Sequence, residues 1–266
     1  MDGTLGAGGH ARGILEASAP DGQLLGLDVD PQALAIARKT LAPYEHRIHL
    51  AQASYTTLAA QLKNLQWDSV DGIVLDLGAS SMQFDTPERG FSFQHDAPLD
   101  MRFGPSALQT AADIVNTYSE SELADVLYEY GEERDSRKLA RAIVKARPLH
   151  TTGQLVAVIE AVSPRKGNRL HPATKTFQAL RIAVNDEFSA LETFLRHLPA
   201  CLNPGGRVAI LTFHSGEDRR VKKAFEAGRR DGVYAEISDE VVRPSAAERN
   251  ANPRSGPAKL RWAKRS

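Results

Sequence analysis

The stretch that decides the fold is Asp2-Gly3-Thr4-Leu5-Gly6-Ala7-Gly8-Gly9-His10. Four of these nine residues are glycine, which lets the backbone turn sharply and approach a ligand without hindrance from side chains. Residues 11–16 can begin a helix, and the exposed N–H groups at such a start favour an electron-rich ligand. Gly6, Gly8 and Ala11 satisfy the pattern G-x-G-x-x-G/A, which calls for a strand before it. Only Met1 precedes Asp2, so the glycines by themselves leave an ordinary surface loop open as an alternative.

The next element is a short buried strand, predicted over residues 23–28 and ending in Asp28. Asp30 and Pro31 suit the N-cap and the first position of the following helix, so we assign Asp30 a structural role. Asp28 then remains to face a ligand. It follows the glycine loop by about 20 residues, the spacing at which such a carboxylate binds the hydroxyls of a ribose.

Predicted strands and helices alternate on both sides of a central helical segment. This alternation predicts an α/β fold with a doubly wound sheet, whose ligand lies at the carboxyl ends of the strands. Residues 70–76 are apolar enough for the middle of a parallel sheet. We expect further strands at 46–50 and 207–212, a turn at 203–206, helices at 31–41 and 217–227, and two paired edge strands at 233–237 and 259–263, with a loop at 243–257.

Helical patterns replace this alternation between about residues 88 and 185. The segment is too long for a crossover between two strands, so we predict an inserted all-helical domain. Helices are expected at 119–130, 134–146 and 152–162, and one long helix, 173–198, is expected to lead back to the sheet. The predicted domains are 1–87 and 186–266 for the two parts of the sheet domain and 88–185 for the insertion.

The composition is that of an ordinary soluble globular protein, and no apolar run is as long as a membrane span. No secretory segment is visible. Cys201 is the only cysteine, which excludes an internal disulfide and a cysteine-cluster metal site and fits a reducing compartment. We expect no bound metal.

A net charge of zero conceals two basic clusters. One lies at 134–147, where six Lys or Arg residues face Asp135 alone, and the other is the tail from Arg243 onward. Such clusters can hold a polyanion, but they also occur as solvated faces. Both interpretations remain open on charge alone.

Separated motifs of the chain resemble those of the RsmH (MraW) family, S-adenosylmethionine-dependent methyltransferases that modify N4 of a cytidine in the decoding region of small-subunit (16S) ribosomal RNA. The motifs follow the family's order over nearly the whole chain, and together they are highly specific. They are DGTLGAGGH (2–10), DVDP (28–31), DLGASS (76–81), ERGFSF (88–93), PLDMR (98–102), YGEE (130–133), HPATKTFQALRI (171–182), PGGR (204–207), FHSGEDR (213–219) and NPR (252–254).

The resemblance implies a class I S-adenosylmethionine-dependent methyltransferase fold, a Rossmann-like sheet with an inserted helical domain. The family also has a segment upstream of the glycine loop that includes the first central strand, and we expect that strand to be largely missing from this chain. Gly216 stands where the family usually has Leu, which we expect to loosen the start of the following helix.

The resemblance also implies the residues of a site for S-adenosylmethionine. His10 could instead cap its helix, and Tyr55 could belong to the core. The implied cofactor-binding residues are Gly8, Gly9, His10, Asp28 on the ribose, Tyr55 beside the adenine, Asp76 next to the sulfonium, and Gln83.

The acceptor is an amino group whose lone pair is delocalised into the pyrimidine ring, so a hydrogen-bond acceptor for its N–H helps the lone pair to develop. Asp76, or a backbone carbonyl of 77–78, is our first choice for this role, and His214 is the second. Phe213 is expected at the adjacent strand tip, where it could stack on an extruded base. The alternative for Phe213 and His214 is a packed strand end.

The helical domain carries the candidate contacts to RNA. Thr174, Gln178, Arg181 and Asn185 recur at helical spacing, and they could either bind phosphate and sugar or form a satisfied polar seam between the two domains. The basic helix at 134–147 is the better candidate, because little acidic charge lies close by. The RNA-binding set is Arg137, Lys138, Arg141, Lys175, Arg181 and Asn185.

We therefore expect an rRNA (cytosine-N4-)-methyltransferase of the bacterial cytoplasm. Its partner is small-subunit rRNA or the 30S particle, with no membrane partner and a homodimer as one option; an upstream targeting segment would make it organellar. An alternative is a catalytically impaired RNA-binding assembly factor of the same fold. A nicotinamide oxidoreductase also fits the glycine loop and Asp28, but no residue set in the insertion suggests hydride transfer.

Overall fold

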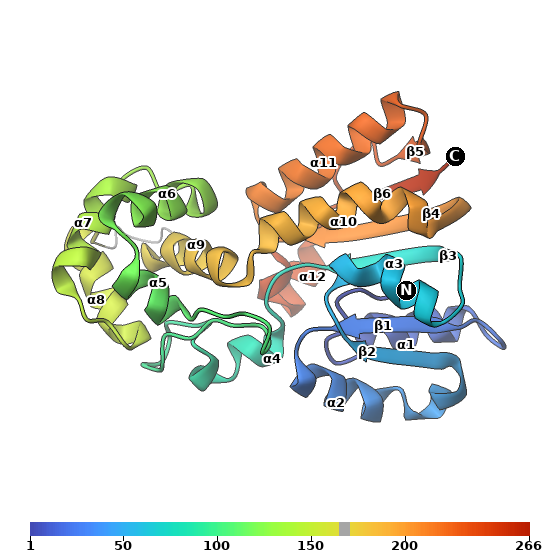
Figure 1. Ribbon diagram of the computed structural model, residues 1–266, viewed down its shortest axis with the longest axis horizontal. Coiled ribbons are helices and arrows are strands. Elements are labelled where there is room, and N and C mark those ends of the chain that lie inside the picture. The colour runs from blue at the N-terminus through green and yellow to red at the C-terminus, as the bar shows by residue number, and fades with distance from the viewer. Residues whose placement is uncertain (165–170) are drawn as a thin grey trace. The chain divides into compact units, whose positions relative to one another are not determined.

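The computed structural model describes residues 1–164 and 171–266. The chain forms two compact units (Figure 1). The sheet unit comprises Met1–Gly78 and Phe188–Ser266, and the helical unit comprises Ala79–Glu187. We expected the boundaries after residues 87 and 185. The first one falls earlier because α4 (Ser81–Phe84) and the 3-10 turn η3 (Pro87–Arg89) belong to the helical unit.

Parallel strands form the centre of the sheet unit, as the alternation of elements predicted. Asp2 joins the two halves of the sheet, because it forms parallel bridges both to Gly26 in β1 and to Val74 in β3. It occupies the place between them where the first central strand was expected. The order is β2 (Ile48–Gln52), β1 (Leu24–Asp28), Asp2, β3 (Val70–Asp76), β4 (Leu202–Thr212), β6 (Lys259–Arg265) and β5 (Tyr234–Ile237), with β6 antiparallel to both of its neighbours.

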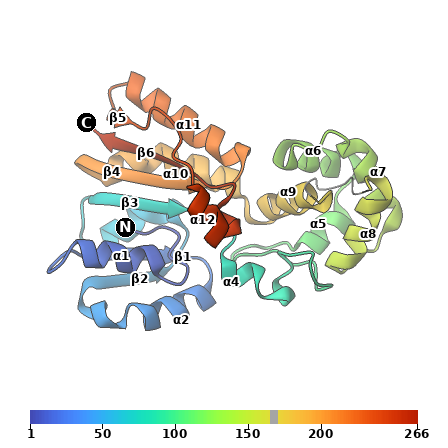
Figure 2. The ribbon, with the colours of Figure 1, turned by 180° about the vertical axis from the view of Figure 1, so that it is seen from behind.

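Helices cover both faces of this sheet. Neighbouring residues of a strand point to opposite sides, so a strand that is apolar throughout needs helices against both faces. Leu24 packs with α1 (Gly9–Ala17) and α2 (Pro31–Thr40). Leu25 and Leu27 pack instead with the second set of helices, and Figure 1 and Figure 2 show the two sets from opposite sides. The second set is α3 (Leu58–Asn64), α10 (Glu187–Cys201) and α11 (Ser215–Arg230).

The helical unit encloses a hydrophobic cluster of its own. Capping boxes start four of its helices in the described ranges, at Ser80, Thr110, Ser119 and Thr151, where each side chain accepts a backbone N–H three residues ahead. The helices after α4 are α5 (Ala111–Thr117), α6 (Glu120–Gly131), α7 (Ser136–Ala146), α8 (Thr152–Val162) and α9 (Ala173–Asn185). In the part of the chain that the structure describes, no helix is both long and apolar enough to cross a membrane.

Three sequence-based expectations about elements were wrong. The single helix expected at 173–198 is two helices, α9 and α10, because Asp186 between them adopts a left-handed conformation with φ 49°. The loop expected at 243–257 contains α12 (Ala246–Ala251), which the Ser245 side chain caps. The expected pairing of 233–237 with 259–263 is confirmed, but 259–263 is not an edge, because β6 lies between β4 and β5. Residues 203–206, expected as a turn, lie within β4, where its pairing with β3 shifts register between Val70 and Gly72. Three further 3-10 turns are η1 (Ala42–Arg47), η2 (Tyr55–Thr57) and η4 (Pro253–Ser255).

Candidate functional site

The glycine loop, residues 2–10, turns at two glycines with positive φ. Gly6 has φ 53° and Gly8 has φ 85°, in the left-handed region where a residue with a Cβ is strained. A Cβ at Gly8 would also lie 3.2 Å from Leu41. Gly8 is the N-cap residue of α1, so the free N–H groups of the first helical turn begin at Gly9. A Cβ at Gly9 would meet nothing within 4 Å, so there is open space beside this turn.

Asp28, at the carboxyl end of β1, ties the glycine loop to the start of α2. Its Oδ2 accepts a hydrogen bond from the backbone N–H of Gly6 (2.8 Å), and its Oδ1 accepts one from Asp30 (2.9 Å). Burial raises the pKa of Asp28, and these N–H groups partly offset that rise. The loop and the acid are thus in direct contact, and binding of a ribose there stays a prediction.

The structural role assigned to Asp30 is confirmed. Its side chain accepts the backbone N–H of Gln32 (2.9 Å), and Pro31 is the first residue of α2. A side-chain oxygen at an N-cap satisfies one of the free N–H groups of the first turn. The two acids of the DVDP motif therefore differ in their surroundings: Asp30 caps a helix and Asp28 contacts the glycine loop.

Asp76, at the carboxyl end of β3, contacts the same loop. Its backbone N–H donates to Thr4 Oγ1 (2.6 Å), and its Oδ2 lies 3.5 Å from His10 Nε2. The N-cap residue of α1 is Gly8, so capping does not explain His10. Among the described residues, Asp76 Oδ1 is buried without a hydrogen-bond partner. Asp76 therefore presents one paired and one unpaired oxygen.

Asp2 and Thr4 complete this corner, although neither residue was predicted to have a role. Asp2 is 1% exposed; its Oδ1 accepts the N–H of Thr4 (3.2 Å), whereas its Oδ2 has no hydrogen-bond partner within the described ranges. Burial is the largest cause that raises the pKa of Asp2 to about 6, and the charge of Asp76 adds to the rise. Buried carboxylate oxygens without a donor are uncommon, so this corner suits a ligand that brings N–H or O–H groups. The start of the motif, Asp-Gly-Thr, was the available signal.

The contact between His10 and Asp76 predicts a pH dependence. The hydrogen bond to Asp76 is the largest cause that raises the pKa of His10 above its ordinary value of 6.5. Protonated His10 therefore stabilises the folded protein below pH 6.5, and that contribution is lost as the pH rises through the raised pKa. We expect the imidazole resonances of His10 to titrate above 6.5 by NMR, and nearer to 6.5 in Asp76→Asn. Equal midpoints in the two proteins would contradict the contact.

Two of the implied cofactor residues have structural partners. Tyr55, in η2, is half-buried and packs edge-on against Phe194, with ring centroids 5.5 Å apart. A Cβ at Gly3 would lie 3.2 Å from the Cβ of Tyr55, so Tyr55 also adjoins the glycine loop. Gln83 belongs to the helical unit, where its Oε1 accepts the N–H of Ser80 (3.0 Å) in a capping box of α4. Contact of Tyr55 and Gln83 with a cofactor stays a prediction.

Phe213 and His214 follow β4, the parallel neighbour of β3. Asp76 pairs with Leu211, so these residues lie at the same edge of the sheet as Asp76. His214 is the N-cap residue of α11: its Nδ1 accepts the N–H of Glu217 (3.4 Å), and its Nε2 lies 3.2 Å from Glu217 Oε1. Because the lone pair of Nδ1 is engaged in this cap, Asp76 remains the better candidate for the proton acceptor.

Gly216 has a packing reason that the sequence does not reveal. It is the buried second residue of α11, and a Cβ there would lie 2.5 Å from Phe188 Cζ. Arg220 covers the ring of Phe188, with its guanidinium carbon 3.6 Å from the centroid. The helix begins at Ser215 despite the glycine, and a larger side chain at position 216 would displace the ring of Phe188.

The basic residues of α7 lie on its exposed face. Its buried residues, Leu139, Ala140 and Ile143, recur at helical spacing and leave Arg137, Lys138 and Arg141 exposed. Lys138 Nζ donates to the carbonyl of Val162 (3.3 Å), and Arg141 pairs with Glu120 (3.2 Å). Arg137 has no hydrogen-bond or ion-pair partner in the described part of the chain. Lys175, on α9, donates to the carbonyl of Glu132 (2.9 Å). Their contact with RNA stays a prediction.

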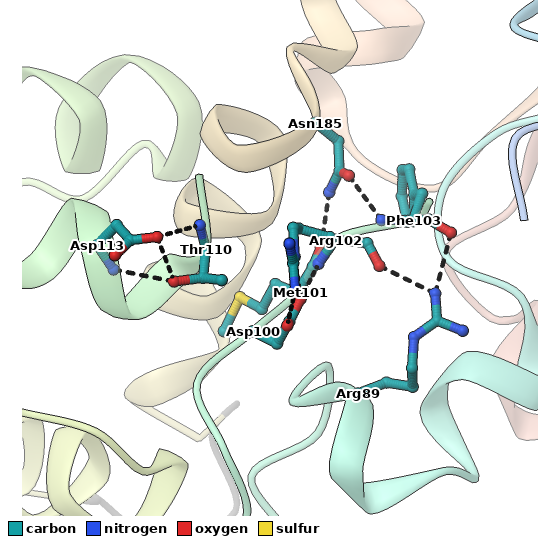
Figure 3. Close-up of polar contacts among 8 residues, drawn as sticks. All are labelled: Arg89, Asp100, Met101, Arg102, Phe103, Thr110, Asp113 and Asn185. Carbon is teal, nitrogen blue, oxygen red and sulfur yellow. Dashed lines mark hydrogen bonds and ion pairs between the residues drawn. The ribbon is translucent and has the colours of Figure 1, made fainter. Parts of the chain in front are cut away.

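Arg181 and Asn185, in contrast, hold the helical unit together. Arg181 makes two bonds to the carboxylate of Glu187, Nε to Oε1 at 2.8 Å and Nη2 to Oε2 at 2.9 Å. Asn185 accepts the N–H of Phe103 and donates to the carbonyl of Met101, both at 2.8 Å (Figure 3). Figure 3 also shows Arg89, which donates to the carbonyl of Phe103. All of these partners belong to the helical unit itself, so the contacts give Arg181 and Asn185 a structural role, and their contact with RNA stays a prediction.

The buried pair of Arg181 and Glu187 predicts a large effect on stability. Their side chains are only 13% and 9% exposed. Arg181→Met would leave the carboxylate buried without its cation, so we expect the free energy of unfolding to fall by about 3–5 kcal/mol in urea titrations. Arg141→Met, which breaks the exposed pair with Glu120, is the control, with an expected change of about 0–1 kcal/mol. Equal losses in the two variants would refute this account of the pair.

Comparisons with known proteins identify the family of the chain. A model of the MraW methylase family matches residues 1–266. Ribosomal RNA small subunit methyltransferase H of Geotalea uraniireducens is 49% identical over 286 residues, covering 100% of this chain and 91% of that protein. The protein of the same name from Cyanothece sp. is 49% identical over 265 residues, covering 100% and 87%.

Likeness to solved structures is weaker. An rRNA methylase from Streptococcus thermophilus has a TM-score of 0.42 and 12% identity, covering 99% of this chain and 84% of that chain, too little to support an argument. The match of the family model over the whole chain is the stronger finding. The chain therefore belongs to the MraW methylase family, which confirms the expected methyltransferase class, α/β methyltransferase fold and cofactor, S-adenosylmethionine.

Proposed function

We propose that the protein transfers a methyl group from S-adenosylmethionine to N4 of a cytidine in the decoding region of small-subunit ribosomal RNA. The observation that carries this proposal is the 49% identity, over the whole chain, to two proteins named ribosomal RNA small subunit methyltransferase H. The nucleotide and the atom rest on the resemblance of the separated motifs, which runs from the glycine loop to residues 252–254.

The glycine loop and the strand tips suit S-adenosylmethionine, which supplies an electrophilic methyl group on a sulfonium. Asp28 keeps free lone pairs on both oxygens for the ribose hydroxyls. The unpaired oxygens of Asp2 and Asp76 fit N–H donors and a positive charge. The left-handed backbone at Gly8 and the open space at Gly9 allow a ligand to approach the start of α1.

The chemistry assigned to this chain is orientation and proton removal. Asp76 Oδ1 accepts the N–H of the amino group, which frees the nitrogen lone pair, and the carboxylate takes up the proton that this nitrogen loses on methylation. Phe213 stacks on the base that has left the RNA helix. Holding the amino group in line with the methyl group is worth about 7–11 kcal/mol of the barrier. We therefore expect positioning to contribute more to the rate than removal of the proton.

The helical unit supplies the contacts to RNA in this proposal, through the exposed basic face of α7. Arg137 is the first candidate because its guanidinium is not engaged within the described residues. Removing one cation that binds a phosphate should reduce the slope of log affinity against log salt by about 0.7–0.9. Small-subunit rRNA or the 30S particle is the proposed partner, in the cytoplasm of a bacterium.

The decisive experiment supplies the protein with S-adenosylmethionine and small-subunit particles from cells that lack its gene. We expect mass mapping to find one added methyl group on a decoding-region cytidine, at N4. Methylation of another nucleotide, or none, would overturn the substrate assignment. Binding of both ligands without transfer would point to the alternative, an RNA-binding assembly factor.

A further inference from the structure

Phe213 differs from the other phenylalanine residues of the sheet unit in the surroundings of its ring. Phe188, Phe194 and Phe225 are buried, and each contacts a second ring. Phe213 is only half-buried and belongs to none of the hydrophobic clusters. In the described ranges its ring contacts no other ring and no cation. The ring is therefore not explained by core packing.

The backbone of Phe213, in contrast, is held firmly. Its N–H donates to Glu217 Oε2 (2.8 Å), and the other oxygen of this carboxylate lies 3.2 Å from His214 Nε2. Glu217 returns a bond, because its own N–H donates to His214 Nδ1 (3.4 Å). The carboxylate thus contacts both residues that link β4 to α11.

A helix cap alone does not require a carboxylate as deeply buried as that of Glu217. Its side chain is 2% exposed, and a buried carboxylate needs several partners to offset the loss of water. An exposed Glu makes the same kind of cap without that penalty, as Glu122 does at the start of α6. Besides capping the helix, the buried carboxylate of Glu217 fixes the position of residues 213–214.

We propose that Glu217 is a positioning residue, which holds Phe213 so that its ring serves as a platform for the planar base of the substrate. This inference rests on the proposed function, since it assumes a base that leaves its stack to reach Asp76. Phe213 is suitably placed, because it follows Leu211, the pairing partner of Asp76 in the neighbouring strand. An aromatic ring can stack on any of the four bases, so it orients the base that accepts the methyl group without contributing to sequence specificity.

A double-mutant cycle tests whether Glu217 acts through Phe213. In the full-length protein with small-subunit particles, we expect Phe213→Leu and Glu217→Leu each to lower kcat/KM by about tenfold, the effect of losing one stacked base. Because both remove the same platform, the double variant should be no worse than either single variant. Glu217→Gln keeps the shape and one acceptor for the N–H of Phe213, so it should recover most of the activity.

Affinity for S-adenosylhomocysteine, measured by calorimetry, separates positioning from general damage. It should stay within about twofold in all of these variants, because a structural defect would weaken cofactor binding as well. Glu226→Gln, which changes a half-exposed carboxylate on the same helix, is the matched control and should behave as wild type.

If the wild-type protein methylates the RNA, either of two results would overturn the proposal. One is that the losses in kcat/KM of the single variants multiply in the double variant. The other is that the variants lose affinity for S-adenosylhomocysteine as strongly as they lose kcat/KM. Absence of methylation by the wild-type protein would instead refute the proposed function, and this inference with it.

Discussion

Replacing Asp76 by alanine is expected to lower kcat by about 10²–10⁴-fold, the usual contribution of a group that accepts a proton in the transition state. Its Oδ1 is buried and unpaired among the described residues, whereas its Oδ2 faces His10. Asp76→Asn keeps a carbonyl oxygen that can accept the N–H of the substrate but cannot take up the proton. We therefore expect Asn to retain more activity than Ala and less than Asp.

Single-turnover rates at saturating S-adenosylmethionine are the appropriate measurement, since they exclude losses that come from weaker binding. Asp68→Ala is the control: Asp68 is exposed and lies just before the same strand, so its loss should leave the rate unchanged. Normal turnover by Asp76→Ala would show that another group takes the proton, and a backbone carbonyl of 77–78 would then be the first to consider.

Much of the sheet could be predicted because its strands are short, apolar and ended by recognisable residues. The strand at 70–76 has the predicted bounds, since a run apolar enough for a parallel sheet leaves little choice of register. Asp30 was assigned correctly because an N-cap followed by proline is a local signal that needs no tertiary contact.

The break between α9 and α10 could not be predicted in the same way. Apolar residues keep helical spacing across the break, so the pattern alone predicts one helix. Asp186 has a left-handed backbone; Arg181 and Glu187 pair across it, and Asn185 bonds to Met101 and Phe103. Such contacts join residues that only the folded chain brings together.

The same limit applies to the candidate site. A sequence shows that Arg137 and Arg181 are both cations on predicted helices, but not that one is exposed and the other is paired with Glu187. It also gives no reason to choose Asp2, whose importance comes from burial between β1 and β3. Charge and spacing in a sequence can identify candidate residues. Their accessibility in the folded chain decides which of them remain available to bind a ligand.

Asp28→Ala tests the other large effect, on affinity for the cofactor. The change removes the acceptor for the N–H groups of Gly6 and Asp30, as well as the proposed contact with the ribose. Hydrogen bonds to a charged group are worth about 1.5–3 kcal/mol each, so we expect the Kd for S-adenosylhomocysteine to rise by about tenfold to hundredfold. Calorimetric titration of the full-length protein measures this rise directly.

Asp30→Ala is the matched control, because the two acids lie only two residues apart and have different partners. Loss of this N-cap should lower the free energy of unfolding by about 1 kcal/mol while the Kd stays near the wild-type value. The opposite pattern, with Asp30→Ala weakening binding and Asp28→Ala leaving it unchanged, would mean that the cofactor does not lie against the tip of β1. The contact between Asp28 and the glycine loop would then have no role in cofactor binding, and the proposed location of the site at this edge of the sheet would be wrong.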